Sequence, residues 1–264
     1  MTDDNFEKNC DTLENYLLQS CKVCNHKKGQ RFSEDSTCDC RNKFCCGVRL
    51  IYGCVPIDLI ITAYAVKPAY DKEALKYFAE NPKEVYERGL SLYLHGDLGV
   101  GKTLCSVLLA INFVNAFSEG GKCGYKHRVN IRFMEAFNFI DRSRMLQSSN
   151  EELSKFKESL NATLFILDDF SNEYKSANNP QYVNSLFENF LRNRISNLLP
   201  TIVTTNVPPE NIGKEYDARI ASLFGFNKDE GTLQGRFLGV AFENPDFRKI
   251  SRDVAWSKFR SRND

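Results

Sequence analysis

The stretch Gly96–Thr103, which reads GDLGVGKT, constrains the fold of this chain more than any other. It matches the pattern G-x-x-x-x-G-K-[ST] of the P-loop, whose glycines allow consecutive backbone N–H groups to turn inward around a polyphosphate. The apolar run Leu90–His95 before it suits a buried parallel strand, and apolar residues recur at helical spacing through residues 104–117 after it. Because a P-loop joins a strand to a helix, this context predicts an α/β nucleotide-binding fold.

The residues of this loop have separate predicted roles in binding ATP. Lys102 can reach the β- and γ-phosphates, and the hydroxyl of Thr103 can bind Mg²⁺. The first turn of the following helix directs its partial positive charge toward the phosphates. The predicted nucleotide-binding residues of the loop are Gly96, Asp97, Leu98, Gly99, Val100, Gly101, Lys102 and Thr103.

Four further apolar runs predict strands, at residues 130–133, 164–167, 201–204 and 237–242. Helical patterns separate them, and strands that alternate with helices favour a parallel sheet covered by helices. We therefore predict a five-stranded parallel sheet flanked by helices, the fold of P-loop NTPases. Ligands of such sheets bind at the carboxyl ends of the strands.

Polar residues follow two of these predicted strands. The run 164–167 leads into Asp168 and Asp169, which is the Walker B arrangement, and the run 201–204 leads to Asn206. Asp168 is predicted to hold Mg²⁺, directly or through its water, and Asp169 to orient or deprotonate the attacking water. Asn206 can hydrogen-bond to the γ-phosphate or to that water. Because the strands end at one edge of the sheet, these residues and the P-loop are predicted to form one site.

Phosphoryl transfer also requires positive charge near the γ-phosphate, which an arginine from a neighbouring subunit can supply. Arg219 and Arg236 are the candidates for such a trans finger, and Arg248, after the fifth predicted strand, is a candidate for sensing nucleotide within its own chain. An isolated arginine is more often an ordinary surface residue, so these three roles are hypotheses.

Cysteines are concentrated near the start of the chain. The sequence has ten, and all but Cys105 and Cys123 lie between residues 10 and 54. Two residues between thiolates allow both to reach one tetrahedral ion, so a C-x-x-C pair predicts a structural Zn²⁺ site, whereas the alternative is a set of free buried thiols. The predicted zinc ligands are Cys21, Cys24, Cys38 and Cys40, with Cys45, Cys46 and His26 as alternatives.

The net charge and the distribution of apolar residues indicate where the protein is located and how its domains are organised. The net charge is +1, so any nucleic-acid contact must come from local patches. The sequence lacks an apolar run of about 18 residues and begins with an acidic, polar segment, so we expect a cytoplasmic protein without a membrane span. We predict a cysteine-rich N-terminal domain at residues 1–54, a linker at residues 55–85 and the nucleotide-binding domain at residues 86–264. The N-terminal domain would begin with an acidic amphipathic helix that docks on a partner or packs on its own domain.

These motifs together resemble those of AAA+ ATPases of the DnaC-like helicase-loader family, with IstB-type transposition helpers as close relatives. The resemblance covers about residues 20–250: HGDLGVGKT is similar to the Walker A motif, LFILDDF to Walker B and PTIVTTN to sensor 1. The cysteine pattern followed by Val55-Pro56 is similar to the front of many loaders. Asp246-Phe247-Arg248 resembles the closing Asp-x-Arg motif of the family.

The resemblance implies partners that the residues alone do not. An N-terminal part would grip the replicative DNA helicase, and the ATPase part would bind single-stranded DNA, as a homo-oligomer or a helicase-bound ring. Basic residues beside aromatic ones are suited to holding single strands, although a solvated basic edge has the same composition. The candidate residues for DNA contact are Lys126, His127, Arg128 and Arg132, beside Tyr125 and Phe133.

Two features depart from the family pattern. In the segment RIASLF, the residue at the family's arginine-finger position is Leu223, whereas Arg236 stands at the matching distance before the fifth strand and is therefore favoured. The helical lid of larger AAA+ proteins is expected to be absent or reduced to one helix.

We therefore predict an ATP-dependent loader of the replicative helicase, with ATP, Mg²⁺ and Zn²⁺ as ligands. The alternatives are a transposition helper ATPase and a zinc adaptor that binds nucleotide without hydrolysing it.

Overall fold

The structure is a computed structural model of the 264-residue chain. It describes residues 3–20, 39–66, 70–117, 129–145, 156–170, 180–227, 229–230 and 232–243. The helices are α1 (Asp3–Ser20), α2 (Cys40–Tyr52), α3 (Ile57–Ala65), α4 (Glu73–Glu80), α5 (Pro82–Arg88), α6 (Lys102–Ala116), α7 (Ala136–Met145), α9 (Pro180–Ser196), the 3₁₀ helix η4 (Pro209–Asn211), α10 (Ile212–Glu215) and α11 (Ala218–Leu223). The strands are β1 (Ser91–Gly96), β2 (Ile131–Glu135), β3 (Leu164–Asp168), β4 (Thr201–Thr205), β5 (Phe226–Asn227), β6 (Thr232–Leu233) and β7 (Phe237–Phe242).

A five-stranded parallel sheet lies at the centre of the molecule, which confirms the predicted sheet. Its strand order is β2-β3-β4-β1-β7, so β1 lies between β4 and β7. All four pairings are parallel, and the carboxyl ends of the strands therefore lie along one edge. The short antiparallel pair β5 and β6, which the sequence analysis did not predict, precedes β7.

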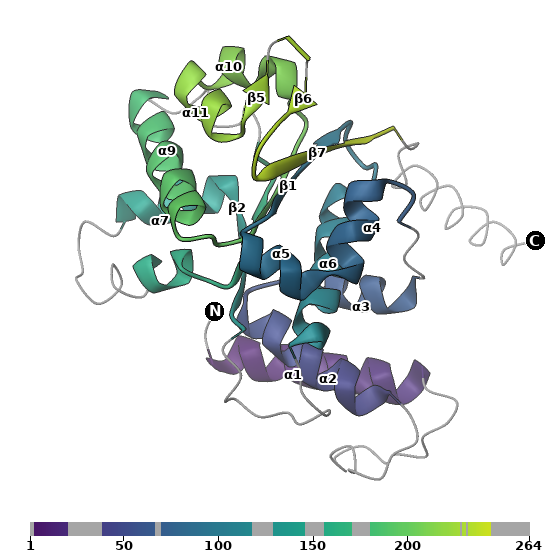
Figure 1. Ribbon diagram of the computed structural model, residues 1–264. Coiled ribbons are helices and arrows are strands. Elements are labelled where there is room, and N and C mark those ends of the chain that lie inside the picture. Colours follow the sequence, from purple (N-terminus) through teal and green to yellow (C-terminus); the bar gives the residue numbers. More distant parts are fainter. Residues whose placement is uncertain are drawn as a thin grey trace, which may run out of the picture.

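Helices cover both faces of this sheet (Figure 1). Along β3 the fully buried side chains alternate between the faces: Leu164 and Ile166 belong to the core shared with α1–α6, and Phe165 and Leu167 to the core shared with α7, α9 and α11. Strands buried on both faces require apolar side chains at every position, which explains the uninterrupted apolar runs in the sequence.

The N-terminal helices pack directly on this sheet structure. Gly47 of α2 allows a close approach to α1, because a Cβ there would lie 2.4 Å from a methyl carbon of Leu13. At the end of α2, the carbonyl of Gly53 accepts a hydrogen bond of 2.8 Å from the amide of Phe133 on β2. The linker predicted for residues 55–85 consists, among its described residues, of α3, α4 and most of α5, which bury Ile60, Phe78 and other apolar side chains in the same core. These residues therefore do not separate two hydrophobic cores.

A buried arginine fixes the amino-terminal edge of the sheet. Arg194 of α9 is 1% exposed, and its guanidinium donates four hydrogen bonds of 2.5–3.0 Å. The acceptors are the carbonyl oxygens of Leu160, Ala162 and Pro200 and the hydroxyl of Thr201, all before or at the start of β3 and β4. Arg194 thus ties α9 to the two strands whose opposite ends carry the predicted acidic and sensor residues.

Candidate nucleotide-binding site

The P-loop lies between β1 and α6, as its motif predicts. β1 ends at Gly96 and α6 begins at Lys102. Gly99 and Gly101 have φ angles of 77° and 95°, which side chains other than glycine rarely allow. Gly96 is required for a further reason, because a Cβ there would lie 2.2 Å from the carbonyl oxygen of Phe242 on β7. The glycines thus permit both the turn of the loop and its close contact with the neighbouring strand.

The ammonium group of Lys102 lies inside this loop, and the residue is 8% exposed. It donates hydrogen bonds to the carbonyl oxygens of Gly96 (2.8 Å) and Asp97 (2.7 Å) and to Oδ1 of Asn206 (2.9 Å). Lys102 and Asn206 are separated by 104 positions in the sequence, but the pairing of β1 with β4 brings them together. Two of the residues assigned to the site from the sequence are therefore in direct contact.

The hydroxyl of Thr103 donates a 2.8 Å hydrogen bond to Oδ1 of Asp168. The same carboxylate oxygen accepts a 2.6 Å hydrogen bond from the hydroxyl of Thr204 on β4. Thr103 and Asp168 are the residues predicted to hold Mg²⁺, and their oxygens are of the kind that this ion prefers. The donor set thus fits a magnesium ion at the end of β3.

Asp169 adopts an unusual backbone conformation directly after β3. Its φ angle of 53° lies in the left-handed region, which aspartate tolerates better than most residues. The amide of Asp169 donates a 3.0 Å hydrogen bond to the hydroxyl of Thr204, and the amide of Phe170 donates a 2.7 Å hydrogen bond to the Thr204 carbonyl. Thr204 is a residue of this site that the sequence analysis missed. Its position two residues before Asn206, in the segment that resembles sensor 1, was the available signal.

Burial controls the electrostatics of this edge. It raises the pKa of Asp168, which the hydrogen bonds from Thr204 and Thr103 oppose and the charges of Asp169 and Glu135 reinforce. Burial also lowers the pKa of His95, the last residue but one of β1, so its imidazole is neutral at pH 7. A buried carboxylate next to further acidic groups is a favourable site for a divalent cation.

A cavity of about 250 Å³ lies on the β7 side of the P-loop. One of its lining residues, Phe242, pairs in register with Gly96 at the end of β1. The cavity lies between the start of α4 and the end of β7, and Lys72 and Glu243 give it polar walls. Its lining residues are Asp71, Lys72, Leu75, Ala241, Phe242 and Glu243.

The structure places Arg236 far from the P-loop of its own chain. Arg236 immediately precedes β7, whose first residue pairs with Ser91 at the start of β1, whereas the P-loop follows the end of β1. With a rise of about 3.3 Å per residue, the length of β1 separates the two by roughly 17 Å. The guanidinium of Arg236 donates a 3.0 Å hydrogen bond to the carbonyl oxygen of Arg88.

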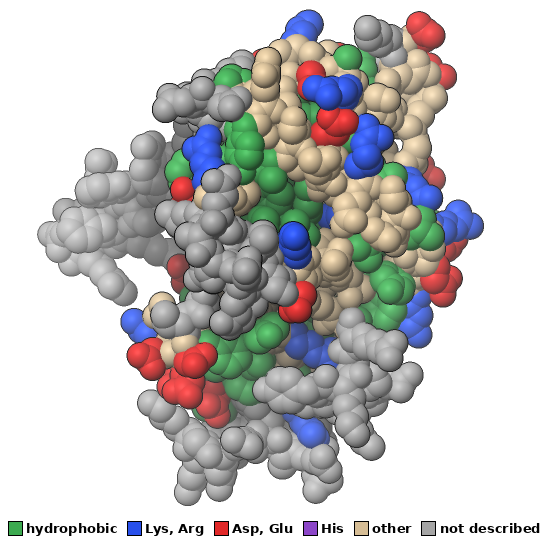
Figure 2. All heavy atoms as spheres, turned by 90° about the vertical axis from the view of Figure 1, so that its left-hand side faces the viewer, with side chains coloured by type: hydrophobic (Ala, Val, Ile, Leu, Met, Phe, Trp, Pro, Cys, Tyr) green, Lys and Arg blue, Asp and Glu red, His purple; other side chains and the backbone are tan. Residues whose placement is uncertain are grey.

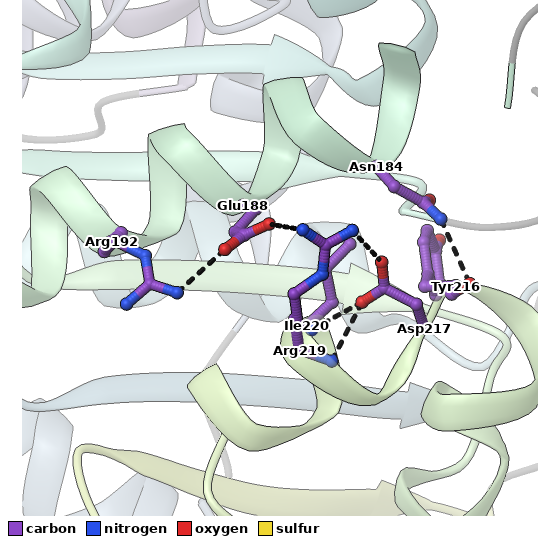
Figure 3. A network of polar contacts seen from close by, with 7 residues as sticks. All are labelled: Asn184, Glu188, Arg192, Tyr216, Asp217, Arg219 and Ile220. Atoms are coloured by element: carbon purple, nitrogen blue, oxygen red, sulfur yellow. Dashed lines mark hydrogen bonds and ion pairs between the residues drawn. The ribbon is translucent and has the colours of Figure 1, made fainter. Parts of the chain in front are cut away.

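Arg219, the other candidate finger, belongs to a network of charged side chains (Figure 3). Its guanidinium pairs with Glu188 of α9 at 3.2 Å and with Asp217 at 3.3 Å. Asp217 also caps α11 through the amides of Arg219 and Ile220, and Glu188 pairs with Arg192 at 2.8 Å. The charge of Arg219 is therefore neutralised by two carboxylates of its own chain.

Several predicted residues lie outside the described part of the chain. These are the nucleotide-sensing candidate Arg248, the zinc candidates Cys21, Cys24 and Cys38, the alternative His26, and the DNA-contact candidates Tyr125, Lys126, His127 and Arg128. Cys40, the fourth zinc candidate, is the buried first residue of α2. Among the described residues, no three or more His, Cys, Asp or Glu side chains form a group that could hold a metal ion. Cys46, an alternative ligand, is buried and directs its thiol to the carbonyl of Ile111 on α6.

Phe133 is one of the two aromatic residues beside the DNA-contact candidates. Phe133 is 5% exposed and packs in the core shared with α1–α6, so its ring is not accessible to a base. Arg132, the neighbouring candidate, is only partly buried. On the face seen in Figure 2, basic and acidic side chains drawn in colour are interspersed, without one large basic patch.

Comparison with known proteins gives matches among solved structures. No protein-family model matches the sequence, and no curated protein matches it either. The crystal structure of DnaI is 20% identical and superposes with a TM-score of 0.51, covering 73% of this chain and 93% of that one. The chain has the fold of DnaI. This is an α/β fold with a five-stranded parallel sheet.

Two other solved structures are similar to a lower degree. The DnaC helicase loader is 20% identical with a TM-score of 0.49, covering 67% of this chain and 95% of that one. Domain III of the Thermotoga maritima replication initiation protein DnaA is 15% identical with a TM-score of 0.46, covering 66% and 65% of the two chains. In the described part of this chain, each helix is too short or too polar to cross a membrane.

Proposed function

We propose that this protein is an ATPase whose site lies at the carboxyl edge of the sheet. One observation carries the proposal: Lys102, Asp168 and Asn206 come from separate segments and meet around the P-loop. Lys102 hydrogen-bonds directly to Asn206, and Asp168 accepts hydrogen bonds from Thr103, the neighbour of Lys102, and from Thr204. A polyphosphate requires a cation and inward-facing amides, and its metal ion requires a carboxylate and a hydroxyl. The site offers the cation in Lys102, the carboxylate in Asp168 and the hydroxyl in Thr103.

Each residue of the site would have a separate role in hydrolysis. Lys102 would exchange its bonds to the loop carbonyls for the β- and γ-phosphates, and Asn206 would then be released to hydrogen-bond to the γ-phosphate or the attacking water. Asp169 would accept the proton of that water. Thr103 and Asp168 would hold Mg²⁺, which when bound neutralises charge on the phosphates. The cavity beside Phe242 is suitably placed for the base of the nucleotide.

A second subunit is the natural source of the additional positive charge. Arg236 lies at the opposite end of β1 from the P-loop, so it cannot reach the site of its own chain. Its guanidinium hydrogen-bonds to a backbone carbonyl, whereas Arg219 is paired with two carboxylates. We therefore favour Arg236 over Arg219 as a trans finger within an oligomer or a helicase-bound ring.

The biological role that we propose is ATP-dependent loading of the replicative DNA helicase. The fold shared with DnaI and the sequence resemblance of the Walker B and sensor 1 segments support it. In this proposal the N-terminal segment contacts the helicase, with a Zn²⁺ ion held by Cys21, Cys24, Cys38 and Cys40, and the ATPase part binds single-stranded DNA.

Phosphate release tests the enzymatic proposal. Wild-type protein should release phosphate from ATP in the presence of Mg²⁺, and Lys102→Ala should reduce the rate by about 100-fold or more, because the variant loses the cation that faces the phosphates. Equal release from both proteins would show that the site is not catalytic and would favour a nucleotide-binding adaptor.

A pull-down with the replicative helicase tests the role as a loader. The full chain should retain the helicase in the presence of ATP. Charge-reversal variants in the exposed acidic face of α1, such as Glu7→Lys combined with Asp11→Lys, should weaken the interaction if this helix contacts the helicase. Retention of a transposase instead of the helicase would favour a transposition helper.

A further inference from the structure

Thr204 lies where the predicted catalytic strand β3 meets the neighbouring strand β4. Its side chain is 2% exposed, and it contacts both acidic residues at the end of β3. The hydroxyl donates to Oδ1 of Asp168 at 2.6 Å and accepts from the amide of Asp169 at 3.0 Å. A hydroxyl has one proton, so donation to the carboxylate leaves its lone pairs for the amide. The direction of both hydrogen bonds is therefore determined.

The two bonds constrain different properties of the acidic pair. The first holds the carboxylate of Asp168 toward the P-loop, where Thr103 donates to the same oxygen at 2.8 Å. The second holds the backbone of Asp169 in its left-handed conformation, with a φ angle of 53°. That conformation is energetically unfavourable for residues other than glycine and persists only where neighbouring groups enforce it. The orientation of the Asp169 side chain follows from it.

We propose that Thr204 is a positioning residue for ATP hydrolysis, which acts by orienting Asp168 and Asp169 through its single hydroxyl. This inference rests on the proposed ATPase activity and deepens it. Thr204 touches neither substrate nor reacting water in this proposal. Its contribution is to align the metal-binding carboxylate and the proton-accepting carboxylate before nucleotide binds, which reduces the reorganisation needed in the transition state.

Three variants separate positioning from mere structural support. Thr204→Val has nearly the shape of threonine but lacks the hydroxyl, and Thr204→Ser retains the hydroxyl without the methyl group. Thr201→Val is the matched control, because Thr201 is equally buried on β4 but lies at the opposite end of the strand and bonds to Arg194. If the valine variant at 204 does not fold, Thr204→Ala provides a second form without the hydroxyl.

Steady-state kinetics give the first readout. We expect Thr204→Val to lower kcat about tenfold or more with KM for ATP changed less than about twofold. The variant lacks a hydrogen bond to a charged group that acts in the chemical step and not in the binding of ATP. Thr204→Ser should recover most of kcat, and Thr201→Val should keep the wild-type kcat. Equal losses at positions 201 and 204, or failure of serine to restore the rate, would overturn the proposal.

Amide hydrogen exchange of Asp169 gives a readout that does not require hydrolysis. In the nucleotide-free protein, this amide should exchange about tenfold faster in Thr204→Val than in wild type, and at the wild-type rate in Thr204→Ser. Unchanged exchange in the valine variant would refute the positioning role even if the protein is an active ATPase. Faster exchange in Thr204→Val than in wild type, together with a wild-type protein that does not hydrolyse ATP, would instead identify a failure of the proposed function.

Discussion

Removal of the buried guanidinium of Arg194 is expected to destabilise the five-stranded sheet. Desolvation lowers the pKa of Arg194 from 12.5 to about 9, so the group remains charged at neutral pH while burial opposes its charge. A shift of that size corresponds to an unfavourable contribution of about 5 kcal/mol. Hydrogen bonds from a charged donor contribute about 1.5–3 kcal/mol each, so the four bonds of Arg194 contribute about 6–12 kcal/mol and exceed this cost by about 1–7 kcal/mol.

Arg194→Met should therefore lower the free energy of unfolding by about 4 kcal/mol, because the bonds are lost and the three carbonyl oxygens remain buried without that donor. For a chain of this size the change corresponds to a decrease in Tm of about 10 °C. Arg194→Lys should be nearly as destabilising, since an ammonium group cannot reproduce the planar, four-bond arrangement.

Thermal unfolding by circular dichroism measures these changes, with Arg192→Met as the control. Arg192 is two positions away on α9, but its side chain is 59% exposed and makes a surface ion pair with Glu188. Its loss should change stability by less than about 1 kcal/mol. A Tm for Arg194→Met within 2 °C of the Arg192→Met value would refute the assigned role of the buried arginine.

The other predictions concern the site itself. Asp169→Asn should retain ATP binding by calorimetry but lose phosphate release by about 100-fold, because asparagine tolerates the left-handed backbone but cannot accept the proton; lost binding would contradict this. Without Mg²⁺ and nucleotide, Asp168→Asn should match or exceed the wild-type Tm at pH 7, because burial raises the carboxyl pKa. Since the folded-state pKa exceeds the unfolded value, wild type gains stability as pH falls through it, and the advantage of the variant should shrink toward pH 4; a constant difference across pH would argue against it. Mixing inactive Asp169→Asn with inactive Arg236→Ala chains should partly restore phosphate release if Arg236 acts in trans, whereas a mixture as inactive as its components would exclude that role.

The sequence predicted those parts of the site that short-range patterns encode. The glycine spacing of the P-loop and the apolar run before it specify the turn from β1 into α6, and the run that ends in Asp168 specifies a buried strand with a carboxylate at its end. The parallel sheet followed from the alternation of strands and helices. Each of these inferences depends on residues that are close together in the chain.

The contacts between strands required the tertiary structure. Thr204 and Arg194 have side chains that are ordinary for the end of a strand and the face of a helix, and their roles arise from partners on other elements. Likewise, the burial of Phe133 and of the apolar faces of α3, α4 and α5 depends on packing against elements elsewhere in the chain, which a short segment does not reveal.

The sequence alone thus determined that a phosphate-binding loop joins a strand to a helix and that acidic and amide side chains follow other strands. The order of the strands decided which of those side chains meet: β4 lies between β3 and β1, so Thr204 reaches the acidic pair and Asn206 reaches Lys102. The physical reason is that local propensity depends on neighbouring residues, whereas a hydrogen bond between strands depends on a packing arrangement to which the whole core contributes.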